Sequence, residues 1–250
     1  MGQKTEDLRL DQLLLARGLF ESRSRARDAV QRGTVTVNGR TVTKPAANVA
    51  ADADIAIDDP AQAYVSRAAL KLVAALDTFA LSPAGLSCLD VGASTGGFTQ
   101  VLLERGADRV TAVDVGHGQM HPTLAAHPKV ANIEGLNARH LTAGDIGNVA
   151  VGFIVSDVSF ISLKLALAPA LTLARPGASC VLLVKPQFEA GREAISKAGL
   201  LKEPETAPAV AAGLEDWLVL DMGWTSLGLI PSPIEGGDGN REFLLAGRKA

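Results

Sequence analysis

Seven apolar runs separated by helical segments are the feature of this sequence that most restricts its fold. The runs occupy residues 87–93, 109–115, 129–135, 151–157, 179–185, 224–230 and 241–247. Segments such as 161–174 and 205–222 lie between them and indicate helices. Strands that are apolar on both faces belong in a sheet covered by helices on both sides, and strands that alternate with helices form parallel sheets. The sequence therefore predicts an α/β fold with a doubly wound, Rossmann-like, mostly parallel sheet.

Residues 1–59 follow a different pattern, which predicts a small α+β domain. Leucines at helical spacing indicate a helix over 7–19, and a second helix is expected over 22–33, where a serine supplies the N-cap. Alternating valines then lead into an Asn38-Gly39 hairpin turn, and alternating isoleucines mark a strand within 52–59.

The first predicted domain, residues 1–59, is basic, whereas the second, residues 67–250, follows a short linker at 60–66. The whole chain has a net charge of -3, yet eight basic residues face only three acidic ones between positions 9 and 44. Such an excess suits a phosphate backbone, although a solvated helix face is the alternative. The candidate RNA contacts are Arg9, Arg23, Arg25, Arg27, Arg32, Lys44 and Arg67.

Other features of the sequence argue against several classes of protein. Two cysteines, Cys88 and Cys180, are too few for a disulfide framework and indicate a reducing, cytoplasmic setting. No run of 18 or more uncharged apolar residues occurs, and the first residues are polar, so neither a membrane span nor a secretory signal is expected. The four histidines lack the spacing of metal ligands, so we expect no metal site.

A glycine-rich segment at residues 89–100 follows the first predicted strand, where sheets of this kind bind ligands. Its pattern, D-x-G-x-x-x-G-G, differs from a dinucleotide fingerprint and lacks the lysine of a phosphate-binding loop. Asp114, 22 positions after Gly92, ends the second strand, where a carboxylate can accept both ribose hydroxyls of an adenosine. A purely structural turn is the alternative. The pattern resembles the S-adenosylmethionine loop of methyltransferases.

That resemblance assigns a set of candidate cofactor contacts around the loop and the ends of the next two strands. They are Asp90, Gly92, Ser94, Gly96, Gly97, Phe98, Asp114 and Asn137. Asn137 occupies the position of an adenine contact, with an amide where a carboxylate is usual.

Charged residues occur where several predicted strands meet the loops. Asp157 ends the fourth run, Lys185 ends the fifth, Glu242 opens the last, and Lys71 lies on the helix before the first. The carboxyl ends of parallel strands meet at one edge of a sheet, and an antiparallel last strand begins at that edge. Each residue alone could be an ordinary turn or surface residue, so the joint occurrence is what indicates a catalytic site.

Segments in both predicted domains resemble one family. SRAALKL, DVGASTGGF, SDVSF, LLVKPQFE and EGGDGNREFLL resemble the TlyA family of ribosomal RNA 2'-O-methyltransferases, which is related to the FtsJ-like enzymes. The segment LDQLLLARGLFESRSRARDAVQRGTVTVNG resembles an S4-type RNA-binding domain. The resemblance implies a seven-stranded methyltransferase sheet with the last strand antiparallel, S-adenosylmethionine as cofactor, and cytidine in ribosomal RNA or ribosomal subunits as substrate. It places the family's K-D-K-E tetrad on Lys71, Asp157, Lys185 and Glu242.

The implied reaction leaves two roles open for Lys185. A ribose 2'-hydroxyl is a poor nucleophile that must lose its proton as it attacks the methyl group of a sulfonium. Lys185 could take that proton if burial or a second cation such as Lys71 made it neutral, or it could stay charged and stabilise the developing alkoxide. Phe188 is expected either to stack on a flipped base or to pack in the core. Two other classes remain as alternatives: an RNA-binding protein with a relic catalytic fold, and a membrane-active haemolysin.

Overall fold

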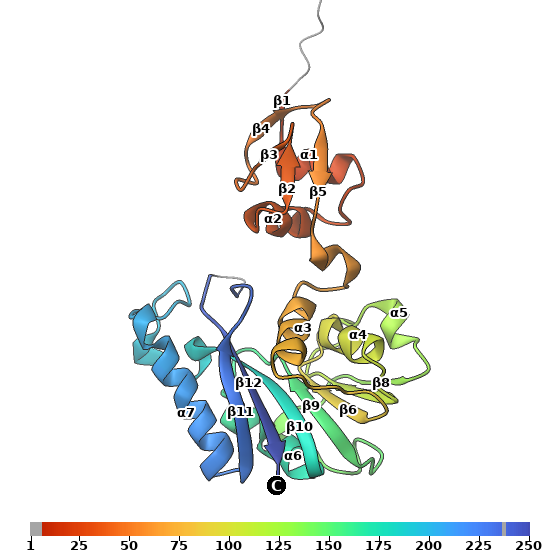
Figure 1. Cartoon of the computed structure of the whole chain (residues 1–250), viewed down its shortest axis with the longest axis vertical. Coiled ribbons are helices and arrows are strands. Elements are labelled where there is room, and N and C mark those ends of the chain that lie inside the picture. Colours follow the sequence, from red (N-terminus) through yellow and green to blue (C-terminus); the bar gives the residue numbers. More distant parts are fainter. Residues whose placement is uncertain (1–6, 237–238) are drawn as a thin grey trace, which may run out of the picture. The chain divides into compact units, whose positions relative to one another are not determined.

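Two compact units make up the chain, which divides between Ala63 and Tyr64. The computed structural model describes residues 7–236 and 239–250 (Figure 1). The first unit ends with a short 3-10 helix, η1 (Pro60–Ala63), so part of the predicted linker at 60–66 is helical. The linker itself stays a prediction.

The first unit combines helices with short strands around a core of its own. Its elements are β1 (Asp7–Arg9), α1 (Leu10–Ala16), α2 (Arg23–Gln31), β2 (Val35–Val37), β3 (Arg40–Thr41), β4 (Asn48–Ala50), β5 (Ile55–Ile57) and η1. Helix α2 begins after the N-cap Ser22, whose hydroxyl accepts a hydrogen bond from the Arg25 amide at 3.3 Å. Leu10, Leu14 and Val30 are fully buried between the helices and the strands, so the helical spacing of the leucines correctly marks the core face.

The predicted helix over 7–19 begins three residues later than expected, because its first residues form strand β1. This strand is antiparallel to β4, with Leu8 opposite Val49. The Asp11 amide then donates a hydrogen bond to the Pro45 carbonyl at 2.9 Å, which ties the start of α1 to the same distant segment. This part of the prediction is wrong because the partner strand lies far along the chain, where helical spacing gives no sign of it.

The second unit is built on one large sheet. Its elements are α3 (Ala69–Thr78), β6 (Ser87–Val91), α4 (Gly97–Glu104), β7 (Arg109–Val113), α5 (Pro122–Ala125), β8 (Val130–Ile133), η2 (Ala138–His140), β9 (Val151–Ser156), α6 (Leu163–Leu173), β10 (Ala174–Val184), η3 (Pro186–Phe188), η4 (Arg192–Ala194), η5 (Pro204–Thr206), α7 (Ala207–Leu220), β11 (Trp224–Pro231) and β12 (Phe243–Lys249). In the described part of the chain, the sheet has seven strands in the order β11-β12-β10-β9-β6-β7-β8. Neighbours are parallel except β12, which is antiparallel to both β10 and β11. The predicted doubly wound sheet with an antiparallel last strand is confirmed.

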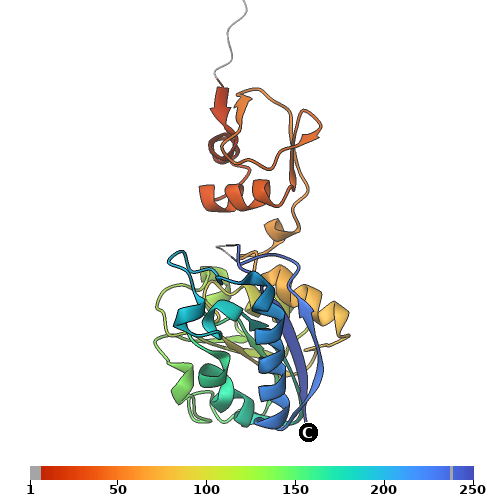
Figure 2. The ribbon, with the colours of Figure 1, turned by 90° about the vertical axis from the view of Figure 1, so that its left-hand side faces the viewer.

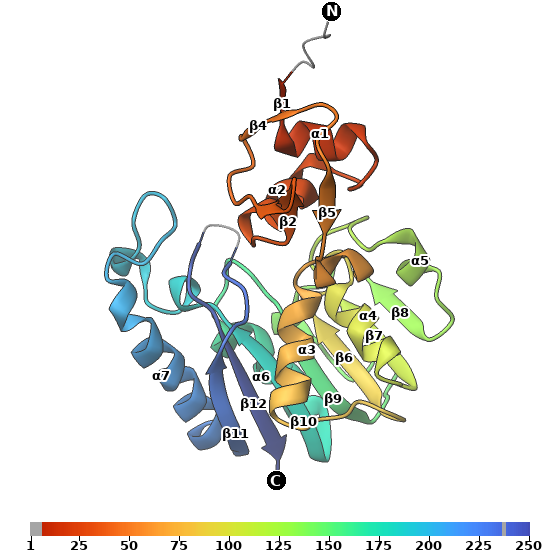
Figure 3. The same ribbon diagram turned by 45° about the horizontal axis from the view of Figure 1, so that its top comes forward.

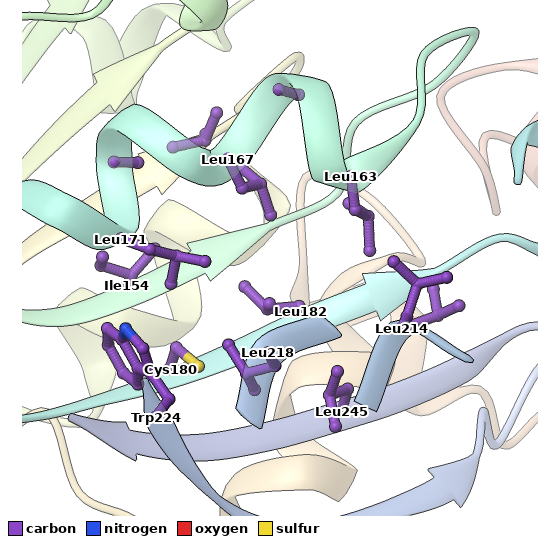
Figure 4. Close-up of a cluster of buried hydrophobic side chains, with 14 of the residues drawn as sticks. Ile154, Leu163, Leu167, Leu171, Cys180, Leu182, Leu214, Leu218, Trp224 and Leu245 are labelled. Atoms are coloured by element: carbon purple, nitrogen blue, oxygen red, sulfur yellow. The ribbon is translucent and has the colours of Figure 1, made fainter. Parts of the chain in front are cut away.

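Helices cover both faces of this sheet (Figure 2). Successive residues of a strand point to opposite faces. Leu182 of β10 therefore packs with α6 and α7, whereas Leu183 packs with α3 and α4. Figure 4 shows the first of these layers, with Ile154, Leu163, Leu167, Leu171, Cys180, Leu182, Leu214, Leu218, Trp224 and Leu245 labelled. Burial on both faces explains why the strands are apolar without alternation.

The ends of β9 and β10 and the start of β12, which adjoin three of the four tetrad residues, meet at one edge of the sheet (Figure 3). Val184, the last residue of β10, is opposite Phe243, the first residue of β12. Ser156, the last residue of β9, is opposite Leu182 of β10. The residues that follow β9 and β10 and the residue that precedes β12 are therefore brought to the same edge.

A carboxyl group is buried on the central strand β6. Asp90 is fully buried, and its Oδ2 accepts a hydrogen bond from Thr99 Oγ1 of α4 at 2.7 Å. Among the described residues, Asp90 Oδ1 has no hydrogen-bond partner. Burial raises the pKa of Asp90 to about 7, the negative charges of Asp157 and Asp114 act in the same direction, and the Thr99 hydrogen bond opposes them. Asp90 is therefore a protonated acid over a wider pH range than an exposed carboxyl group.

This raised pKa predicts that the contribution of Asp90 to the stability of the second unit falls as pH rises. Between about pH 4 and 7 folded Asp90 keeps a proton that the unfolded chain releases, so its contribution to the free energy of unfolding falls by about 1.4 kcal/mol per pH unit. Asp90→Asn mimics the neutral acid and should escape this loss. Urea unfolding, followed by fluorescence of Trp217 and Trp224, should show the variant gaining on the wild type from pH 5 to 7.

The exposed Asp108→Asn is the matched control, because it removes the same charge from the surface of the same unit. Its stability should differ from that of the wild type by a constant amount across this range. Parallel pH curves for Asp90→Asn and the wild type would show that the pKa of Asp90 is not raised.

Candidate active site

The loop after β6 approaches the loop after β9 too closely for a side chain. Gly92 has a φ of +82°, and a Cβ placed there would lie 2.9 Å from Val158 Cγ1 and 3.0 Å from the Asp157 carbonyl oxygen. The Asp157 amide also donates a hydrogen bond to the Val91 carbonyl at 3.2 Å. Only glycine combines this left-handed backbone with so close an approach, so Gly92 holds the two loops together at the strand ends.

Asp114 fixes the loops that follow β6 and β7. Its Oδ2 accepts a hydrogen bond from the Ser94 amide at 2.8 Å, and its Oδ1 accepts one from the Gly116 amide at 2.7 Å. A carboxylate oxygen can accept more than one hydrogen bond. Asp114 is therefore held in place by the backbone and still has acceptor capacity for a ligand.

A cavity of about 490 Å³ lies at these strand ends. Its volume falls within the range of small-molecule and cofactor sites, about 300–1,000 Å³. Five predicted site residues line it, namely Gly92, Ser94, Asp114, Asn137 and Asp157. Sequence reasoning missed other lining residues, namely Val115, Gln119, Ser159, Phe160 and Ile161.

The other predicted cofactor residues lie behind the loop, where their contacts are with protein. Asp90 and Phe98 are buried. Gly96 and Gly97 lie at the start of α4, where a Cβ on Gly97 would be 2.9 Å from the Cβ of Ser66. These residues shape the loop, and their contact with a cofactor stays a prediction.

Lys185 is held by two groups that belong to the segment after β9. Its Nζ lies 2.6 Å from Asp157 Oδ1 as an ion pair, although the angles there are not those of a hydrogen bond. The hydrogen bond goes to Ser159, whose Oγ accepts it at 2.7 Å. Lys185 and Asp157 retain only 11% and 19% of their side-chain exposure. Ser159 is within the segment SDVSF, but its spacing gave no reason to single it out.

Lys71 pairs with Glu242, which lies 171 positions further along the chain. Lys71 Nζ donates a hydrogen bond to Glu242 Oε2 at 2.5 Å, and their side chains are 8% and 3% exposed. A buried charge needs a partner, and each of these side chains supplies it for the other. The sequence suggested Lys71 as a second cation beside Lys185. In the structure, the ammonium group of Lys71 is paired with the carboxylate of Glu242.

The four residues of the predicted tetrad thus form two ion pairs at one strand edge. Lys185 follows Val184, Glu242 precedes Phe243, and Val184 and Phe243 are register partners. Two ammonium groups are therefore matched by two carboxylates at this edge of the sheet.

Glu189 joins the segment after β10 to the start of α6. Its Oε1 accepts a hydrogen bond from the Leu163 amide at 2.7 Å, and its Oε2 accepts one from Ser162 Oγ at 2.6 Å. A carboxylate at a helix N-terminus satisfies free amides and interacts favourably with the helix dipole. Glu189 is a residue that sequence reasoning missed, and it connects the segments that carry Lys185 and Phe160.

Phe160 lies at the rim of the cavity with its ring in solvent. It is 90% exposed and has a φ of +66°, a conformation that bulky residues rarely adopt. Its ring centroid lies 5.2 Å from that of the partly buried Phe188. An open hollow of about 620 Å³, lined by both rings and by Arg192, adjoins the cavity through Phe160 and Ile161.

The predicted RNA contacts differ in how they are held. Arg9 and Arg23 both bind the buried carboxylate of Asp11. Arg32 forms an ion pair with Asp59 at 2.7 Å and is only 15% exposed, so it also holds the first unit together. The remaining predicted contacts are partly or fully exposed: Arg25, Arg27, Lys44 and, in the second unit, Arg67.

Residues 7–236 and 239–250 contain neither a candidate metal-binding cluster nor a helix that could span a membrane. No cluster of three histidine, cysteine, aspartate or glutamate side chains there could hold a metal ion. No helix formed by these residues is long and apolar enough to cross a membrane.

Comparison with known proteins finds matches over both units. Residues 64–249 match the FtsJ-like methyltransferase family, and residues 8–55 match the S4 domain. The chain is 43% identical over 242 residues to the 16S/23S rRNA (cytidine-2'-O)-methyltransferase TlyA of Mycobacterium tuberculosis, which covers 95% of this chain and 88% of that protein. It is 38% identical over 238 residues to Hemolysin A of Brachyspira hyodysenteriae, with 95% and 98% covered.

A solved structure shows the same arrangement of elements. A hemolysin-named protein from Streptococcus thermophilus matches with a TM-score of 0.75 and 39% identity, covering 98% of this chain and 90% of that one. The identity, the coverage and the fold agree with the strand order and the glycine-rich loop described above. The chain therefore belongs to the FtsJ-like methyltransferase family and, with an S4 domain before the methyltransferase domain, to its TlyA-like members.

Proposed function

We propose that this protein transfers a methyl group from S-adenosylmethionine to a ribose 2'-hydroxyl of ribosomal RNA, with cytidine as the nucleotide. The observation that carries the proposal is the position of Lys185, whose two partners, Asp157 and Ser159, both line the cavity at the strand ends. The activity in the name of the Mycobacterium tuberculosis relative supports the same nucleotide and the same atom. A ribosomal RNA substrate places the reaction in the cytoplasm.

The residues around the cavity fit the methyl donor. S-adenosylmethionine supplies an electrophilic methyl group on a sulfonium sulfur. The Asp114 carboxylate can accept hydrogen bonds from its ribose hydroxyls, and Gly92 leaves the backbone open to close approach. The Oδ1 of Asn137 is occupied by the Arg139 amide at 3.1 Å, which leaves the Asn137 amide hydrogens for a base.

Lys185 is best suited to hold the acceptor oxygen as a charged group. An ammonium has three N–H donors, of which Ser159 accepts one, while Asp157 pairs with the charge without a hydrogen bond. A remaining donor can bond to the 2'-hydroxyl and stabilise the negative charge that develops as the hydroxyl proton passes to solvent. Holding the oxygen in line with the methyl group supplies a further part of the rate.

Lys71 and Glu242 support this arrangement from the neighbouring strand. Their ion pair is almost fully buried beside the end of β10, so it fixes the start of β12 against α3. We assign the pair to positioning the edge of the sheet that receives the acceptor ribose.

The acceptor base fits the hollow beside Phe160 and Phe188. Proteins that recognise unpaired RNA bases stack them on aromatic side chains. An exposed ring, held in an uncommon backbone conformation next to the methyl-donor cavity, supplies such a surface. Phe188 packs against Phe160 and so supports the stacking ring, whereas stacking of Phe188 itself on a base stays a prediction.

The first unit supplies affinity for the RNA. Its match to the S4 domain and its excess of arginine support backbone contacts by α2 and the β2–β3 hairpin. The exposed Arg27 and Lys44 belong to this surface. Ribosomal RNA or a ribosomal subunit is therefore the proposed partner.

Replacing Lys185 with alanine should abolish methyl transfer while the donor still binds. The rate should fall at least about 1,000-fold, because the group that holds the acceptor oxygen is lost. Transfer to ribosomal RNA and calorimetric binding of S-adenosylmethionine measure the two effects. Lys197→Ala, which removes an exposed lysine from the same segment, is the control and should keep its activity. Normal turnover of Lys185→Ala would contradict the assignment.

The pH dependence of the wild-type rate separates the two roles of Lys185. A lysine that stays charged gives a rate that changes little between pH 6 and 8. A lysine that removes the proton gives a rate that rises about ten-fold per pH unit in that range. The second result would assign proton removal to Lys185.

Asp114→Asn should weaken binding of S-adenosylmethionine about ten-fold or more, because hydrogen bonds to a charged acceptor are worth about 1.5–3 kcal/mol. An asparagine oxygen can still accept a hydrogen bond from Ser94 or Gly116, so the loop should stay folded. Calorimetry measures the dissociation constant, thermal melting checks the fold, and Asp108→Asn controls for the lost charge. An unchanged dissociation constant would remove Asp114 from the donor site.

A further inference from the structure

A buried carboxylate in the first unit holds two arginines, one from strand β1 and one from helix α2. Asp11, in the first turn of α1, has no exposed surface. Arg9 donates to it twice, from Nε to Oδ1 and from Nη2 to Oδ2, both at 3.1 Å. Arg23, the first residue of α2, donates from Nε to Oδ2 at 2.9 Å. One side chain therefore sets the positions of two guanidinium groups.

The two guanidinium groups keep most of their capacity for another anion. Their side chains remain 41% and 45% exposed, although the carboxylate between them is buried. A guanidinium has five N–H donors, of which Arg9 commits two and Arg23 one to Asp11. Two positive charges against one negative charge leave the cluster positive.

Other arginines of this unit are arranged differently. Arg32 is 15% exposed and faces Asp59 alone, so its pairing closes a contact within the unit. Arg25 lies 3.7 Å from Glu21, whose side chain is 81% exposed, which is a loose surface pair. Among the ion pairs described for this unit, only those at Asp11 join one buried carboxylate to two exposed guanidinium groups.

We propose that Asp11 is a positioning residue that fixes Arg9 and Arg23 as a clamp for a backbone phosphate of RNA. The planar guanidinium matches phosphate through paired hydrogen bonds, which a point charge does not. Holding both groups in place before binding reduces the side-chain freedom that is lost on binding. This inference rests on the proposed function in one respect, namely that RNA is the partner of the first unit.

Asp11→Asn in the full-length protein tests the clamp, because charge alone predicts the opposite result. Removing an acidic group from a basic surface should strengthen RNA binding if only the electrostatic attraction matters. Loss of the clamp should instead weaken binding to purified 16S and 23S ribosomal RNA about ten-fold at near-physiological salt. Glu21→Gln removes the same charge from an exposed site of the same unit, and it should leave binding unchanged or slightly tighter.

Arg23→Lys is the second variant, which keeps the net charge and tests the clamp even if Asp11→Asn does not fold. A lysine lacks the Nε donor that binds Asp11 and the paired donors that match a phosphate. It should weaken binding about three- to ten-fold, with a smaller dependence of the binding constant on salt concentration. Thermal melting of both variants verifies that the first unit is folded.

The binding measurements distinguish a failure of the clamp from a failure of the proposed RNA-directed function. A wild-type protein that binds neither ribosomal RNA would overturn both. Wild-type binding together with undiminished binding by folded Asp11→Asn, or by Arg23→Lys, would overturn the clamp and leave the proposed function standing. Weakened binding by both variants, with Glu21→Gln unchanged, would establish it.

Discussion

The antiparallel pairing of β12 with β10 is the interaction on which the candidate site depends. Parallel strands alone would place only their carboxyl ends at the ligand edge, so the loops after β6, β7, β8, β9 and β10 would supply the side chains there. Because β12 runs the other way, its first residue lies opposite the last residue of β10. Glu242 is thereby brought to the edge where Lys185 leaves the sheet, and it meets Lys71 from α3.

Carboxylates act in this protein mainly as organisers of other groups. Asp157 and Glu242 each hold a lysine, Asp114 and Glu189 hold backbone amides, and Asp11 holds two arginines. A buried ion pair contributes little net stability compared with apolar packing, since desolvation offsets the attraction. What such pairs supply instead is a defined position for a cation, which both methyl transfer and phosphate binding require.

The two proposed activities place opposite demands on the chain. Methyl transfer needs a sheltered cavity with charges fixed to within small distances, and a large sheet covered by helices on both faces supplies it. RNA binding needs exposed positive charge. The smaller first unit has a hydrophobic core of its own and carries such charge on its surface. Asp90 belongs to the first of these demands, because its buried carboxyl group links β6 to α4 beside the loop that lines the cavity.

The sequence by itself determined every strand of the large sheet, both helices of the first unit and the glycine-rich loop, because periodicity and turn chemistry are encoded within a few neighbouring residues. It also indicated that Lys71, Asp157, Lys185 and Glu242 belong together. Only the tertiary structure decided which carboxylate pairs with which lysine, that Ser159 holds Lys185, and that residues 7–9 form a strand. Those contacts join segments far apart in the chain, so they depend on the order of strands in the sheets rather than on any local pattern.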